Sequence, residues 1–213
     1  MSAPKTPGSE VAKPSARMRR ADRKRQLLSH AKQLFVTLGY QNTTTEKIAR
    51  AAGVSEPMLY RHFRHKKALF LEVLQEIRDA TLTRWQTASA EITDPLARIH
   101  AIADSYLGST REHALEYRIM HRSLVETEDE EILAMLRAFY LDSEAILAQI
   151  IREGQDAGIF RPSLDPRVGA WELIRTALGY TLTLPLGPPV YQEPNYIPHA
   201  IDCMLRCLLK TDV

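Results

Sequence analysis

The stretch that most constrains the fold, residues 43–70, has the pattern of a short helix, a tight turn, a second short helix and the start of a longer helix. Apolar residues recur at helical spacing up to Ala52. Gly53 then breaks the pattern, because a residue without a β-carbon can adopt the positive φ of a sharp turn. Ser55 follows as a candidate N-cap, and Pro57 lies in the first turn, where a missing N–H costs nothing. This pattern predicts two helices joined by a tight turn.

The second of these helices divides into an apolar and a polar face. Leu59 and Phe63 are four residues apart and would share the buried side. The opposite side carries Glu56, Pro57, Tyr60, Arg61 and Arg64. A two-helix unit whose second helix exposes such a face has the form that enters the major groove of DNA.

A longer series of residues around this unit has a specific order and spacing: Gly39 and Tyr40, Thr43 and Thr44, Ile48 and Ala49, residues 52–55 (AGVS), Leu59 and Tyr60, His62 and Phe63, Lys66, and Leu69 and Phe70. In this series the chain resembles the DNA-binding unit of the TetR family of bacterial transcriptional regulators, over roughly residues 20–70. Lys47 departs from the family, which often has an acid there to complete a capping box from Thr44. We therefore expect this helix start to be less fully capped.

The resemblance implies two groups of DNA contacts. Thr44, Tyr60, His62 and Lys66 would hold phosphates, and Glu56, Pro57, Met58 and Arg61 would face base edges; Ser55, at the helix start, is included with them. Physical chemistry agrees for Thr44, since a hydroxyl at a helix start suits a phosphate, and for Arg61, which can donate two hydrogen bonds to guanine. Three alternatives stay open: Glu56 could only stabilise its helix start, Tyr60 could pack within the unit, and His62 could have a protein partner.

The charge of the chain is divided between its two parts. The net charge of the 213 residues is only +2, but residues 1–67 contain 15 Lys and Arg against 4 Asp and Glu, and residues 68–213 contain 13 against 22. The resulting +11 and −9 indicate a nucleic-acid-binding front and an acidic body. A merely solvated basic tail is the alternative, but the positive charge continues into the two-helix unit. For the basic run of residues 17–25, contact with DNA and a purely solubilising role both stay open.

Composition favours a cytoplasmic protein, and the resemblance to DNA-binding regulators implies that it is nucleoid-associated. Two cysteines cannot form a disulfide framework, which is consistent with a reducing compartment. No apolar run approaches the ~20 residues of a membrane span. The first 20 residues lack the apolar centre of a signal peptide, so we expect no membrane contact.

Helical patterns continue to the C-terminus and predict an all-α fold of about nine helices. Residues 1–16 are polar and expected to be disordered. Residues 17–66 would form the helix-turn-helix DNA-binding domain, here called the head, and residues 67–213 a helical ligand-binding and dimerisation domain, here called the body. The expected helices are approximately 21–38, 44–52, 56–63, 66–90, a helix beginning at the Asp-Pro pair 94–95, and 115–125, 129–157, 165–183 and 196–209.

The TetR resemblance further implies a small-molecule effector bound inside the body and a homodimer. Amphipathic or adaptable side chains are predicted to line the pocket, although each alone could be ordinary core: Trp85, Tyr106, Tyr117, Met120, His121, Phe139 and Tyr140. The last two helices have broad apolar faces and are predicted to pair with their copies. The predicted interface residues are Trp171, Ile174, Leu178, Ile201, Met204, Leu205 and Leu208.

Catalytic and metal sites are not predicted. The sequence contains no GxSxG, Walker A or HExxH pattern. His199, Cys203 and Cys207 share one helical face but span ~12 Å along the axis, too far for one ion. We therefore predict no cofactor, no metal and no enzymatic activity.

Together these observations predict a ligand-responsive transcriptional regulator, a repressor released from double-stranded operator DNA by a small molecule. Two alternatives stay open. One is an architectural DNA-binding dimer without an effector, and the other is a helical small-molecule-binding or scaffolding protein without operator specificity.

Overall fold

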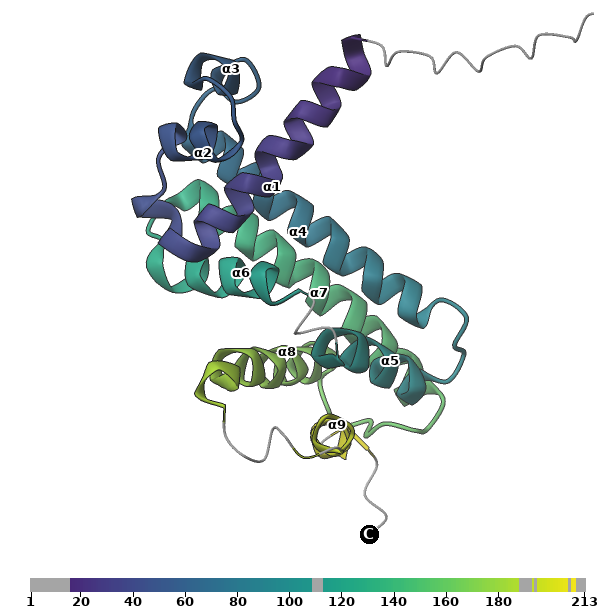
Figure 1. Cartoon of the computed structure of the whole chain (residues 1–213). Coiled ribbons are helices and arrows are strands. Elements are labelled where there is room, and N and C mark those ends of the chain that lie inside the picture. Colours follow the sequence, from purple (N-terminus) through teal and green to yellow (C-terminus); the bar gives the residue numbers. More distant parts are fainter. Residues whose placement is uncertain (1–15, 109–112, 188–192, 194, 207, 210–213) are drawn as a thin grey trace, which may run out of the picture.

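The computed structural model describes residues 16–108, 113–187, 193, 195–206 and 208–209. The predicted all-α fold is confirmed for these residues, whose only β feature is an isolated bridge between Phe160 and Leu209. The helices are α1 (Ala16–Asn42), α2 (Thr45–Ala51), α3 (Glu56–Tyr60), α4 (Lys66–Ser89), α5 (Pro95–Gly108), α6 (Ala114–Glu126), α7 (Glu130–Asp156), α8 (Pro166–Thr183), the short 3₁₀ turn η1 (Leu184–Leu186) and α9 (Tyr196–Arg206) (Figure 1).

Several helix ends differ from the sequence prediction: α1 begins at Ala16 and not near residue 21, and α3, expected to reach residue 63, ends at Tyr60. The first helix was expected to end at Gly39, and Gly39 does leave helical geometry with φ of 79°, but one further turn follows it to Asn42. The last helix was expected to reach Leu209 and ends at Arg206, because Phe160 and Leu209 instead form the bridge, beside which the Arg161 N–H donates to the Leu208 carbonyl. The tail predicted to be disordered, residues 1–16, lies almost entirely outside the described residues.

The buried side chains of the head belong to the same continuous apolar core as those of the body. The apolar side of α1 packs on α2, as the helical period of its sequence predicts. The buried side chains include Leu27, Ala31 and Phe35 of α1, Ile48 of α2, Leu59 of α3 and Phe63 after it. Thr43 is also buried, and its hydroxyl donates to the Gly39 carbonyl at 2.7 Å, which fixes the link between α1 and α2.

α4 runs from the head into the body, where it packs on α5 and α7 (Figure 1). α7 packs most extensively against α8, and α9 packs mainly on α5. α6 lies against α1, so a body helix supports the head directly. Ion pairs reinforce this junction: the Lys67 ammonium lies 3.2 Å from a carboxylate oxygen of Asp129 and 2.8 Å from one of Glu131.

No helix in the described part of the chain combines the length and the apolar character needed to cross a membrane.

Candidate nucleic-acid interface and ligand cavity

The turn between α2 and α3 has the geometry that its sequence predicts. Gly53 has φ of 64°, and the N–H groups of Gly53 and Val54 donate to the carbonyls of Arg50 and Ala49 at 3.1 and 3.0 Å. A positive φ is cheap only for a residue without a β-carbon. The exposed face of α3 is therefore held at a fixed angle to α2.

The start of α2 has only one of the two hydrogen bonds of a capping box. Thr44 is the N-cap, and its hydroxyl oxygen accepts the Lys47 N–H at 3.2 Å. The Lys47 side chain cannot complete a capping box, and its ammonium instead donates to the Asn42 carbonyl at 2.9 Å. Thr44 is exposed, so its hydroxyl proton remains available to an incoming phosphate.

Ser55 occupies the N-cap position of α3, but its side chain makes no capping hydrogen bond. Its backbone is extended, with φ of −76° and ψ of 150°, yet its hydroxyl caps no N–H. Pro57 and Met58 lie in the first turn of the same short helix, with Pro57 exposed and Met58 half-buried. The exposed Ser55 hydroxyl is therefore available to a partner outside the chain.

Three side chains of α2 and α3 hold one another in place. The Thr45 hydroxyl donates to a Glu56 carboxylate oxygen at 2.5 Å, and the Tyr60 hydroxyl lies 3.2 Å from the Thr45 hydroxyl and 3.4 Å from the same Glu56 oxygen. Tyr60 is nevertheless 48% exposed. Its ring is therefore not core, and its hydroxyl remains accessible at the surface.

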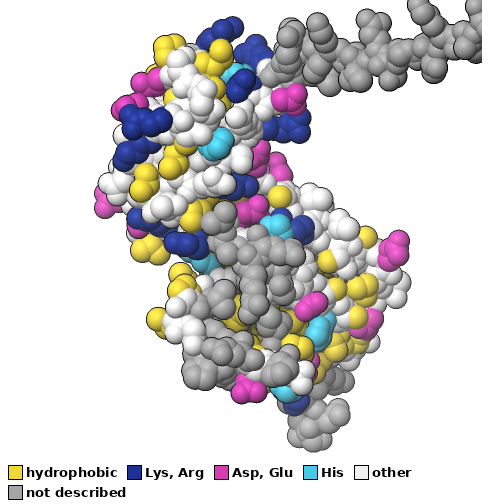
Figure 2. All heavy atoms as spheres, viewed as in Figure 1, with side chains coloured by type: hydrophobic (Ala, Val, Ile, Leu, Met, Phe, Trp, Pro, Cys, Tyr) yellow, Lys and Arg dark blue, Asp and Glu magenta, His cyan; other side chains and the backbone are white. Residues whose placement is uncertain are grey.

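A positive surface surrounds α3. Arg61 and Arg64 are exposed, and His62 is half-buried. The pKa of His62 is lowered, first by burial and then by the positive charges of Arg20, Arg61, Lys24 and Arg23. The basic start of α1 therefore lies close to α3, and Figure 2 shows Lys and Arg side chains gathered over this end of the molecule.

Lys66, predicted to bind phosphate, is engaged within the head. Its ammonium donates to the Tyr40 carbonyl at 2.8 Å and lies 4.3 Å from the centre of the Tyr40 ring. Burial lowers its pKa. The ammonium also donates to the Gln41 carbonyl at 3.4 Å, and both bonds tie the start of α4 to the end of α1. An ammonium has three N–H donors, so one is left for a phosphate.

The body contains a cavity that is enclosed by α4, α5, α6, α7 and α8. It has about 430 Å³ of unfilled space, including the part open to solvent. All seven side chains predicted to form a ligand pocket line it: Trp85, Tyr106, Tyr117, Met120, His121, Phe139 and Tyr140. A second cavity of about 380 Å³ lies beyond Trp85 and Tyr106, which line both. The aromatic and aliphatic walls are of the kind that line small-molecule sites.

The first cavity has few polar groups. His121 is 8% exposed, and its ring nitrogens lie 3.2 and 3.4 Å from the Thr181 hydroxyl. Burial lowers the pKa of His121 to about 4, so the imidazole is neutral near pH 7. Burial also raises the pKa of Tyr140 to about 12, so its hydroxyl keeps its proton. The cavity therefore presents neutral hydrogen-bonding groups.

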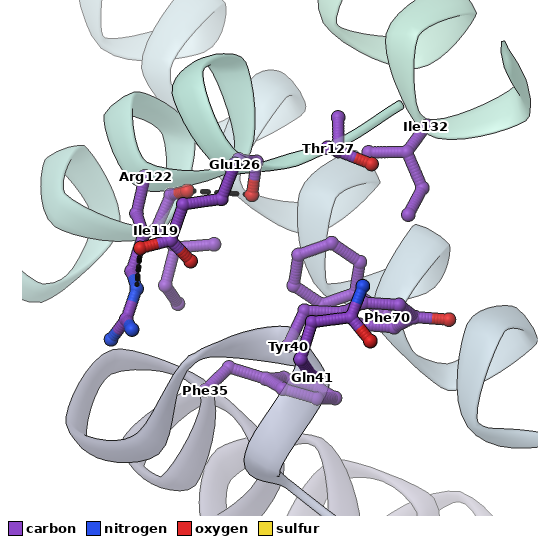
Figure 3. A pocket seen from close by; sticks show the side chains of 10 residues that line it. Phe35, Tyr40, Gln41, Phe70, Ile119, Arg122, Glu126, Thr127 and Ile132 are labelled. Atoms are coloured by element: carbon purple, nitrogen blue, oxygen red, sulfur yellow. Dashed lines mark hydrogen bonds and ion pairs between the residues drawn. The ribbon is translucent and has the colours of Figure 1, made fainter. Parts of the chain in front are cut away.

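A third cavity lies where the head meets the body. It has about 360 Å³ of unfilled space, solvent-open part included. Figure 3 shows Phe35, Tyr40 and Gln41 of α1 on one side and Arg122 and Glu126 of α6 on the other. The Arg122 guanidinium donates to Glu126 at 2.7 Å and packs so closely on Gly39 that a β-carbon there would lie 2.6 Å from it.

Comparison with known proteins gives the family. Residues 27–73 match the model of bacterial regulatory proteins of the tetR family. The chain is 31% identical over 152 residues to the HTH-type transcriptional repressor KstR2 of Mycolicibacterium smegmatis, covering 68% of this chain and 71% of KstR2. The chain belongs to the TetR family of bacterial regulatory proteins.

Other relatives have different roles. The HTH-type transcriptional activator FasR of the same organism is 31% identical over 137 residues, 64% of this chain, and the chain spans only 63% of FasR. The nucleoid occlusion factor SlmA of Marinomonas sp. is 28% identical, over 67% of this chain and 73% of SlmA. The fold is shared with AibR, solved in complex with isovaleryl coenzyme A and operator DNA, at a TM-score of 0.71, with 22% identity, 88% of this chain and 98% of AibR.

Several residues predicted to form the dimer interface are buried within the single chain of this TetR-family protein. Ile201, Leu205 and Leu208 are 0 to 3% exposed. Because these side chains are buried within the chain, they are not available to a partner. Ile174 and Leu178 line the first cavity, and Met204 lines the second. Trp171 is half-buried, and its indole N–H donates to the buried Glu144 at 2.8 Å.

Several cavity residues were missed by the sequence analysis. Thr81 and Ser143 line the first cavity with Ile77 and Ala177. Their positions carried a weak signal, since Ile77, Thr81 and Trp85 are spaced by four along α4 and share a face. Thr45, which positions Glu56, had no signal in the sequence because its partners are on another helix.

The described residues contain no group of three or more His, Cys, Asp or Glu side chains placed to hold a metal ion. Cys207, one of the three residues considered above, is not among the described residues.

Proposed function

We propose that this TetR-family protein is a homodimeric transcriptional repressor. It binds operator DNA through α2 and α3, and a small molecule bound in the cavity of the body releases it from the operator. Residues 17–66 act as the DNA-binding domain and residues 67–213 as the ligand-binding and dimerisation domain. The DNA contacts are the predicted residues 55–58 and 60–62 with Thr44 and Lys66. In this role the protein acts in the cytoplasm, on the nucleoid, and carries out no catalysis.

The observation that carries this proposal is that α6 both lines the cavity and packs against α1 of the head. Tyr117, Met120 and His121 line the cavity. In the preceding turn, Glu116 accepts from Lys32 of α1 at 3.3 Å and from Arg84 of α4 at 3.1 Å. A ligand that displaces the cavity wall must therefore also displace contacts that hold α1.

The relatives support parts of this reading. KstR2 is named a repressor, and AibR was solved with both an acyl-coenzyme A and operator DNA. SlmA, named for nucleoid occlusion, corresponds more closely to the alternative of a DNA-binding protein without an effector. The apolar and aromatic lining of the cavity in the body favours an effector for this chain.

Reciprocal binding of operator and effector tests the proposal. The operator is first selected from genomic fragments that the purified protein retains. Trp85 and Trp171 are the only tryptophans, and Trp85 lines the cavity, so Trp171→Phe leaves a single reporter there. Candidate apolar effectors are titrated with and without operator, and fluorescence is followed.

We expect the effector to quench or shift Trp85 emission and to bind more weakly when operator is present, by the same factor by which it weakens operator binding. Trp85→Phe, which keeps Trp171, is the control and should respond less. An effector that binds free and operator-bound protein equally well would refute release and leave the alternative without an effector.

A further inference from the structure

The first cavity also indicates which chemical class of effector it accepts, an inference that rests on the proposed function. We propose that the effector is an uncharged, mainly apolar molecule whose single hydroxyl or carbonyl oxygen hydrogen-bonds to the Tyr140 hydroxyl and the His121 imidazole.

The lining of the cavity, as far as the structure describes it, has no charged side chain, which indicates an uncharged ligand. None of the described residues that line the first or the second cavity is Asp, Glu, Lys or Arg. A charged group taken from water into such a site would lose its hydration without gaining a counter-ion. The Arg84 guanidinium donates to Thr81 of the lining at 3.0 Å, but it also donates to Glu116 at 3.1 Å. Its charge is therefore already paired.

The Tyr140 hydroxyl carries the second step. Tyr140 is 8% exposed and lines the cavity. Its ring packs against Phe139 and Trp171, with centroid distances of 5.1 and 6.2 Å, but its hydroxyl has no hydrogen-bond partner among the described residues. The hydroxyl oxygen is not among the fully buried unpaired atoms, so it keeps access to open space and can pair with a ligand in the cavity.

His121 provides the matching second group. A neutral imidazole has one donor and one acceptor nitrogen. Thr181 is its only hydrogen-bonding partner in the described residues and can use one of the two nitrogens at a time. The nitrogen that Thr181 does not use can pair with a ligand, and His121 and Tyr140 line the same cavity. The other polar groups of the lining are hydroxyls, which carry no charge, so the site suits a ligand that is mainly apolar.

The proposal is tested with four probes that differ in one property: naphthalene, 2-naphthol, 2-naphthoate and choline. Binding to the full-length protein is measured by isothermal titration calorimetry at pH 7. 2-Naphthol should bind at least tenfold more tightly than 2-naphthoate and than choline, whose cation could be attracted only by the aromatic rings. Tighter or equal binding of either charged probe, or no binding of 2-naphthol, would overturn the proposed class.

Tyr140→Phe isolates the hydrogen bond, because it removes one oxygen and keeps the ring. It should weaken 2-naphthol about tenfold, about 1.4 kcal/mol, and leave naphthalene unchanged. His121→Gln should act in the same direction. Tyr180→Phe, on α8 but outside the lining of this cavity, is the matched control and should change neither probe. Equal weakening of naphthalene and 2-naphthol by Tyr140→Phe would indicate disturbed packing and refute the hydrogen bond.

Operator release is measured separately with the same probes and with charged compounds. If a charged compound releases operator and 2-naphthol does not bind, the repressor function stands and the proposed class is wrong. If 2-naphthol binds through Tyr140 but no compound alters operator binding, the class stands and the proposed function fails.

Discussion

At the residue scale, Arg61 is the side chain best placed to read DNA sequence. It is exposed at the end of α3, and no hydrogen bond or ion pair between described residues engages its guanidinium. Arg50 on α2 differs, because its guanidinium lies 2.6 Å from a carboxylate oxygen of Glu46. Arg61 can therefore give both of its parallel donors to one guanine.

We expect Arg61→Ala to cost ~1–3 kcal/mol per half-site and to relax the preference at one base position. Fluorescence anisotropy on operator and on random duplex would measure both effects. Arg50→Ala is the control and should cause a small loss that is the same for both duplexes. An equal loss on both duplexes for Arg61→Ala would show that Arg61 contacts only phosphate.

His121 gives a second prediction at this scale, on stability against pH. Its pKa is about 4 in the folded protein because of burial, and ~6.5 when the chain is unfolded. Between these two pKa values the imidazole is protonated in the unfolded state and neutral in the folded state. The free energy of unfolding therefore falls as pH drops from ~6.5 toward 4. Between pH 7 and pH 5 this group should remove about 2 kcal/mol.

His121→Gln cannot take up a charge and should lose this part of the pH dependence while remaining folded. Urea unfolding at pH 7 and pH 5 would compare the variant with the wild-type protein. If both proteins lose the same stability between the two pH values, the folded-state imidazole is not shielded as the structure indicates.

At the scale of single elements, the end of α7 depends on two glycines, Gly154 and Gly158. The chain reverses at Gly158, where φ is 72°, and the N–H groups of Ile159 and Phe160 donate to the Gly154 carbonyl at 2.8 and 3.1 Å. The Phe160 ring is fully buried and lies directly on Gly154. A β-carbon at Gly154 would come within 2.1 Å of that ring.

Gly154→Ala should therefore destabilise the protein by about 1–3 kcal/mol through overpacking, although alanine is the better helix former. Gly179→Ala, compared in a variant that is monomeric by sedimentation, is the control on α8, where an added β-carbon meets nothing within 4 Å in the same chain. It should stabilise by about 0.5–1 kcal/mol. Thermal unfolding of the two variants would check the opposite signs, and a neutral Gly154→Ala would show that Phe160 moves aside easily.

At the scale of the whole molecule, the dimer surface has to be relocated. The inner face of α9 is used within the chain, mainly against α5. α8 still exposes Val168 and Leu182, at 51% and 55%, on the face that also carries Gly179. We infer that a second copy covers this face of α8 in the dimer.

We expect Val168→Glu with Leu182→Glu to give folded monomers that bind operator weakly, because two half-sites one DNA turn apart require a dimer. Sedimentation at micromolar concentration and far-ultraviolet circular dichroism would measure mass and folding. Leu141→Glu, at an exposed apolar site on α7, should remain dimeric. A wild-type monomer, or a dimeric double variant, would contradict this interface.

The head and the all-α fold could be predicted from the sequence because their determinants are local. The positive φ at Gly53, the N-cap at Thr44 and the Asp-Pro helix starts each depend on a few neighbouring residues. Helical periodicity likewise showed which side of each helix is buried, and all seven predicted pocket residues do line one cavity.

Only the tertiary structure decided what covers each buried side. Periodicity is the same for a face that meets another helix of the chain, a cavity or a partner, so Leu178, Met204 and Ile201 all looked alike. The structure places Leu178 at the first cavity, Met204 at the second and Ile201 in the core. The packing of helices far apart in sequence makes that choice, and it also joins Glu116 to Lys32 across 84 positions of the chain.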